Sequence, residues 1–166
     1  MEISAPACRP VLVLGLVAGL LATGLVELAS RAPTATVRPV AAVVPAIDVL
    51  HEWDRRRAAA YAEGDVRALA RLYAPRSTAA RADVALLRAY LRRGLTVDSL
   101  TMQVFSVQVL TRRDGELTMR VVDRIAGGNV IGRSRCKPMP RDFPARHEME
   151  LHRVGGDWRV ARVADV

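Results

Sequence analysis

The chain has 166 residues and a formal net charge of +8, and 51% of its residues are hydrophobic. This length accommodates one domain of ordinary size beside an N-terminal segment. The basic residues are nearly all arginines, but they are scattered and aromatic residues are scarce, so the composition argues against a nucleic-acid-binding protein. Cys8 and Cys136 lie on either side of the apolar N-terminal segment, which excludes a disulfide framework.

Residues 11–26 carry no charge, and residues 11–30 reach the roughly 20 residues that a helix needs to cross a membrane. We therefore predict a tail and transmembrane anchor over residues 1–30, with Glu27 reaching toward one interface. A cleaved signal peptide is the alternative. The small-residue cleavage sites are poor and Arg9 is the only basic side chain before the apolar run, so we favour an uncleaved anchor.

Residues 31–45 are rich in Pro, Ala and Thr and lack helical periodicity, which predicts an extended linker. Arg9 on one side of the apolar run and Arg31 and Arg38 on the other leave the positive-inside rule nearly balanced. The stalk-like linker favours an N-terminus inside the cell and a domain outside. The expected location is the cell membrane, with a single span and an extracytoplasmic domain over residues 46–166.

Apolar residues at helical spacing predict two helices, one around residues 50–61 and one over residues 66–73. Gly64 can close the first helix in the left-handed conformation, and Asp65 can cap the second. A third helix follows, capped by Ser77 or Thr78 and closed by Gly94. Its apolar stripe is Ala80, Val84, Leu87 and Leu91.

From residue 100 the apolar period changes to two, which predicts strands. The first strand changes parity near residues 104–106, which indicates a bulge, and Asp114-Gly115 forms a hairpin turn. Residues 127–144 are expected to form a long irregular connection with a short strand at residues 129–132. Two further strands, joined at Gly155-Gly156, complete an α+β fold in which three helices cover one face of a bent antiparallel sheet of four to five strands.

The segments AYAEGDVRALARLYAP (residues 60–75) and L-x-R-x-GG-x-WRV (residues 151–160) resemble the nuclear transport factor two-like superfamily, which includes SnoaL-like and ketosteroid-isomerase-like cone folds. The resemblance covers residues 47–166. Isomerases of this superfamily carry their base near a hairpin between the second and third helices, but only residues 74–79 separate those helices here. No catalytic residue is therefore carried over.

One membrane span followed by such a domain also resembles the Mce-associated membrane proteins and the assembly factors of type IV secretion systems. That resemblance implies a non-catalytic protein-interaction or assembly module with an envelope protein as partner. The resemblance to the nuclear transport factor two-like superfamily implies a further possibility, a homodimer formed across the sheet. The alternative is a protein that binds a small apolar ligand in the cone, or an isomerase or cyclase that acts there.

Asp123 is the foremost candidate residue, because it falls on the core-facing parity of its strand. We expect an ion pair between Asp123 and Arg57, and a pocket acid or base is the alternative. Tyr61, at a core position of the first helix, and His147 are the other candidates for a pocket. His147 and His152 point to opposite faces of their strand, so no metal site is predicted, and no cofactor motif is present.

Overall fold

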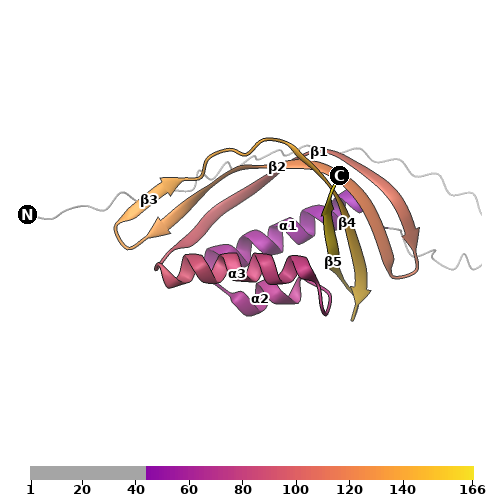
Figure 1. The fold of residues 1–166 in the computed structure, drawn as a ribbon, viewed down its shortest axis with the longest axis horizontal. Coiled ribbons are helices and arrows are strands. Elements are labelled where there is room, and N and C mark those ends of the chain that lie inside the picture. Colours follow the sequence, from indigo (N-terminus) through magenta and orange to yellow (C-terminus); the bar gives the residue numbers. More distant parts are fainter. Residues whose placement is uncertain (1–43) are drawn as a thin grey trace, which may run out of the picture. The chain divides into compact units, whose positions relative to one another are not determined.

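The computed structural model describes residues 44–166, in which three helices lie on the concave side of a bent sheet (Figure 1). The helices are α1 (Ala46–Glu63), α2 (Val66–Arg71) and α3 (Thr78–Arg92). The strands are β1 (Thr96–Arg113), β2 (Glu116–Gly132), β3 (Arg135–Pro138), β4 (Ala145–Val154) and β5 (Asp157–Asp165). The antiparallel sheet has the order β1-β2-β4-β5, and β3 pairs with β2. The predicted α+β arrangement is confirmed.

The predicted transmembrane anchor and most of the linker lie outside the described residues. Within residues 44–166, no helix combines the length and the apolar character that a membrane crossing requires.

The ends of the helices follow the predicted chemistry. Gly64 adopts a left-handed conformation with φ of 68° and closes α1, and the Asp65 carboxylate accepts hydrogen bonds from two backbone N–H groups at the start of α2. Ser77 caps α3 by accepting a hydrogen bond from the Ala80 N–H. A Cβ at position 64 would lie 2.8 Å from Leu91 Cδ2, so the turn between α1 and α2 packs closely on α3.

The long β1–β2 pair bends because its register shifts at several points. The predicted irregularity is present between Val104 and Ser106, and further shifts lie between Asp98 and Thr101 and between Val109 and Thr111. These shifts let the sheet curve around the helices.

The short strand predicted at residues 129–132 is present as the end of β2, but the long irregular connection predicted around it over residues 127–144 is wrong. β2 continues to Gly132, and β3 returns along it, so most of this segment is a second hairpin. A Cβ at Gly128 would meet the Leu100 backbone at 3.3 Å. Here glycine permits close approach within a sheet.

The core lies between the helices and the sheet. Backbone hydrogen bonds join Ala74 N–H to Val160 O at 2.9 Å and Val160 N–H to Leu72 O at 3.0 Å, which fasten the end of α2 to β5. The largest fully buried side chains of the core are Leu50, Leu69, Leu87, Val97, Leu117, Met119, Val121, Leu151 and Val160.

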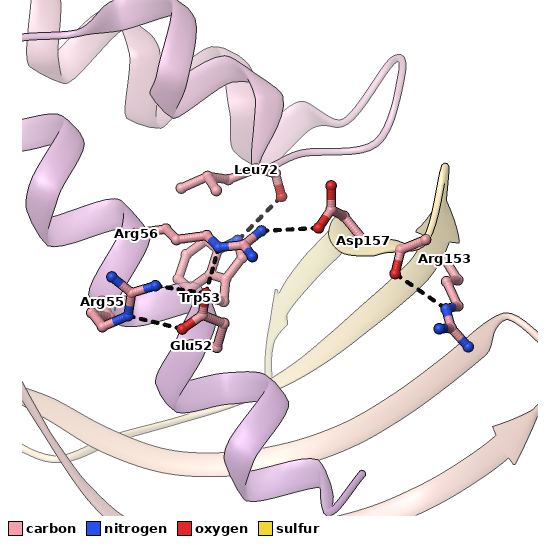
Figure 2. Close-up of polar contacts among 8 residues, drawn as sticks. Glu52, Trp53, Arg55, Arg56, Leu72, Arg153 and Asp157 are labelled. Carbon is pink, nitrogen blue, oxygen red and sulfur yellow. Dashed lines mark hydrogen bonds and ion pairs between the residues drawn. The ribbon is translucent and has the colours of Figure 1, made fainter. Parts of the chain in front are cut away.

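Polar contacts tie α1 to its neighbours (Figure 2). The Trp53 indole N–H donates to the Leu72 carbonyl at 3.2 Å, and Arg56 Nη1 lies 3.1 Å from Asp157 Oδ1 at the start of β5. The Arg56–Asp157 pair is exposed and contributes less than about 1 kcal/mol. The position of α1 therefore depends mainly on its buried apolar face.

Candidate functional site

A pocket of about 350 Å³ lies between α1, α3 and the concave face of the sheet. Its wall is mainly apolar, but ionisable and hydroxyl side chains interrupt it. The lining residues come from α1, α3, the segment after α2 and the strands β1, β2, β4 and β5. They are Leu50, Trp53, Asp54, Arg57, Tyr73, Ala79, Ala82, Asp83, Leu86, Met102, Asp123, His147, Met149 and Val163.

Asp54 is the most unusual group in this wall. Its Oδ2 atom is buried and has no hydrogen-bond partner within residues 44–166. Burial raises the pKa of Asp54 to about 7, Arg57 opposes this shift, and the negative charge of Asp123 adds to it. Near neutral pH the carboxyl group is therefore divided between its protonated and ionised forms.

Asp123 and His147 approach each other across the β2–β4 pair. Val121 is the register partner of His147, so Asp123 lies two residues further along β2 on the same face. His147 Nε2 is 3.7 Å from Asp123 Oδ2. Burial raises the pKa of Asp123, although His147 and Arg57 act in the opposite direction.

Arg57 does not pair with Asp123 as predicted, because Asp83 on α3 takes its guanidinium group. Arg57 Nε and Nη2 donate to the two Asp83 oxygens at 2.8 and 2.7 Å, a bidentate geometry that suits the guanidinium fork. Asp83 lies directly across from α1, whereas Asp123 acts on Arg57 only as a more distant charge. The predicted Asp123–Arg57 ion pair is therefore wrong.

Two tyrosines complete the hydrogen bonding of Asp83. The Tyr61 and Tyr73 hydroxyls each donate to a different Asp83 oxygen at 2.6 Å. Burial opposes ionisation of Asp83, but Arg57 and the two hydroxyls outweigh it and lower the pKa of this carboxyl. Burial and the Asp83 charge raise the pKa of both tyrosines. This network is fully paired, so it forms a rigid wall of the pocket.

The structure thus separates the four candidate residues. Asp123, His147 and Arg57 line the pocket, while Tyr61 lies behind Asp83 and is not part of the lining. Asp123 and His147 form one group with Asp54, and Arg57 and Tyr61 belong to the paired network around Asp83.

The sequence interpretation missed Asp54 and Asp83. A signal for Asp54 was present, because Leu50, Asp54, Arg57 and Tyr61 follow the spacing of one helix face. Asp83 similarly lies three residues after Ala80 and four before Leu87 on the buried stripe of α3. A carboxyl group within an apolar stripe must be paired or protonated. Asp83 is paired with Arg57, whereas the raised pKa of Asp54 favours its protonated form.

The part of the chain that the structure describes holds no cluster of three or more His, Cys, Asp or Glu side chains that fits a metal ion. The pocket does contain acid and base groups of its own. Asp54, Asp123 and His147 can hold, donate or accept a proton beside an apolar ligand.

No protein-family model matches the chain, and no curated protein matches its sequence. Solved structures that match include the intermembrane space region of the chloroplast protein ARC6, with 8% identity over 72% of this chain and 92% of that chain and a TM-score of 0.49. Aln2 from a Streptomyces species matches with 16% identity over 71% of this chain and 87% of that chain, with a TM-score of 0.48.

An NTF2-like protein with a cystatin-like fold from Novosphingobium aromaticivorans matches with 16% identity over 70% of this chain and 78% of that chain, with a TM-score of 0.43. The matches therefore include nuclear transport factor two-like folds. They give no support to the architectural likeness to Mce-associated membrane proteins.

Proposed function

We propose that the domain binds a small, largely apolar ligand in the pocket between α1, α3 and the sheet, and that Asp54 makes the polar contact with it. The Oδ2 atom of Asp54, which is buried and has no hydrogen-bond partner in the described part of the chain, carries this proposal. A pocket of about 350 Å³ falls within the range of small-molecule sites, in which a few polar groups interrupt an apolar wall.

A carboxyl group that titrates near neutral pH can donate a hydrogen bond to a ligand carbonyl or take a proton from an adjacent carbon or hydroxyl. Asp123 and His147, 3.7 Å apart, supply a second acid–base group in the same pocket. Two such groups fit proton transfer of the isomerase or cyclase type, in which one group removes a proton and the other returns it. Binding alone requires only Asp54.

A second candidate function is a protein-interaction or assembly module. Large apolar side chains of β1 remain exposed, with Phe105 at 49% and Val109 at 47% of their accessible surface. Such side chains can contact an envelope protein or a second copy of the chain. This proposal goes together with the single-span anchor over residues 1–30 and an extracytoplasmic domain, which rest on the sequence alone.

A pair of substitutions on α3 tests the ligand proposal. Ala82 and Ala85 are both exposed, but only Ala82 lines the pocket, so Ala82→Trp places an indole at its mouth and Ala85→Trp is the matched control. Saturation-transfer NMR on the full-length protein would screen neutral cyclic ketones and phenols. We expect binding to the parent and to Ala85→Trp, and loss of binding in Ala82→Trp.

Equal signals from the two variants, or no signal from the parent, would contradict a ligand site in this pocket. Copurification from solubilised membranes then tests the second candidate. Recovery of a stable complex with an envelope protein favours an assembly module, whereas recovery of the protein with a bound small molecule favours the ligand proposal.

A further inference from the structure

A second hollow, of about 560 Å³, lies at the end of the domain where α3 ends and the β2–β3 hairpin turns. Four arginines line it, two from each side: Arg92 and Arg93 at the end of α3, and Arg133 and Arg135 in the hairpin. We call these four residues the arginine hollow. It shares no lining residue with the pocket that holds Asp54.

The pairing of the sheet brings the four arginines together. β1 begins at Thr96, shortly after Arg93, and Thr96 pairs with Ile131 near the end of β2. Gly132 follows and pairs with Arg135 across the turn. A Cβ at position 132 would lie 2.9 Å from Leu95 Cδ2, so the absence of a side chain lets the hairpin approach the end of α3. This convergence is a consequence of the fold.

The charges of the hollow are not compensated within the described part of the chain. Its lining contains no Asp or Glu, and the ion pairs among residues 44–166 involve other cations. Arg56 is also exposed, but unlike the four arginines of the hollow it forms ion pairs within the described residues, with Glu52 and with Asp157. Four guanidinium groups around one hollow repel one another, and a bound anion would offset that repulsion.

Structural roles account for some of these arginines. A cation in the last turn of α3 interacts favourably with the free carbonyl groups there, and charged residues on the edge strand β3 discourage pairing with another chain. Either role needs one or two charges at its own position. Neither requires charges from both elements to converge on the same hollow.

We propose that the arginine hollow binds a phosphate group that carries more than one negative charge, either on a free polyphosphate or on a lipid phosphomonoester. Guanidinium groups bind phosphate oxygens in a bidentate manner, and two facing pairs can hold one multiply charged group between them. Ser134, at the turn of the hairpin, offers a further hydroxyl donor. This site is independent of the ligand proposed for the Asp54 pocket.

Calorimetry on the full-length protein in micelles of a non-ionic detergent tests the proposal with two probes, pyrophosphate in solution and phosphatidic acid mixed into the same micelles. Arg133→Gln with Arg135→Gln removes two charges from the hollow. Arg81→Gln with Arg88→Gln is the matched control, because these exposed arginines of α3 lie outside it. We expect the hollow variant to lose about tenfold or more in affinity and the control to stay within about twofold of the parent.

Binding of pyrophosphate alone identifies a free phosphate ligand, binding of phosphatidic acid alone identifies a lipid headgroup, and binding of both shows that the phosphate group itself is recognised. The proposal is overturned if neither probe binds. It is also overturned if both variants lose affinity equally, because attraction to the net charge of +8 then explains the binding. If the hairpin variant melts below the parent, Arg92→Gln with Arg93→Gln repeats the comparison from the other wall.

Discussion

His147 Nε2 lies 3.7 Å from Asp123 Oδ2, in the same pocket wall that contains Asp54. Because the Arg57 guanidinium group is paired with Asp83, no arginine within the described residues forms an ion pair with Asp123. The pocket therefore contains two kinds of polar structure, a fully paired network around Asp83 and an incompletely paired group around Asp54. These two parts should respond differently to substitution and to pH.

The raised pKa of Asp54 makes stability depend on pH. The folded protein keeps this proton up to about pH 7, whereas the unfolded chain loses it near the ordinary value of 3.8. Between these values the folded state binds more protons, so stability falls as pH rises and reaches its lower level above about pH 7. Asp54 alone should lower the free energy of unfolding by on the order of 4 kcal/mol across this pH range. Urea unfolding across this range should show a steeper fall for the parent than for Asp54→Asn, and equal slopes would contradict the assignment.

Asp83→Asn should lower the free energy of unfolding by about 3 kcal/mol or more, because it leaves the buried Arg57 charge without its partner. The double variant Asp83→Leu with Arg57→Met should be less destabilised, since it removes both charges. Asp157→Asn, which breaks an exposed ion pair with Arg56, should cost less than about 1 kcal/mol. Thermal and urea unfolding would compare the variants, and a mild effect of Asp83→Asn alone would count against a structural network.

Asp123→Asn should leave stability near neutral pH almost unchanged. If Asp123 formed the ion pair with Arg57 that the sequence predicts, this variant would instead melt at a lower temperature than the parent. Because the charge of Asp123 helps to raise the pKa of Asp54, the variant should also lower that pKa. Melting curves together with the NMR titration of Asp54 would check both effects. A large loss of stability with an unchanged titration would show that Asp123 has a structural partner.

Gly64→Ala should destabilise the domain by about 1–2 kcal/mol, because alanine is strained at a φ of 68°. The new Cβ would also displace Leu91 Cδ2, which lies 2.8 Å away. Gly155→Ala tests the contribution of this contact, since Gly155 also has a positive φ but has no atom within 4 Å of its Cβ position. Urea unfolding should show a larger loss at Gly64 than at Gly155.

Local patterns in the sequence were sufficient to place the helices and most of the strands. Gly64, Asp65 and Ser77 each fulfil the predicted role, since capping depends on residue type and near neighbours. The bulge near residues 104–106 was visible as a change of parity. The β2–β3 hairpin was missed because the glycines within it serve a close approach between segments, which no local pattern shows.

The site was only partly predictable for the same reason. The parity of β2 placed Asp123 on the inner face, but the choice of partner for Arg57 depended on how α3 packs against α1. Helical spacing places Asp54 on the inner face of α1 together with Arg57, but it does not show which of them is paired. That difference arises from three-dimensional packing.

The central claim is that the pocket holds an Asp54 carboxyl group that changes protonation near neutral pH. Carbon-13 NMR of the parent protein labelled at the aspartate carboxyl carbons measures this directly, with Asp54→Asn to assign the signal. We expect a titration midpoint at about pH 7. A midpoint close to the ordinary value of 3.8 would contradict it, because Asp54 would then be a solvated or paired carboxylate.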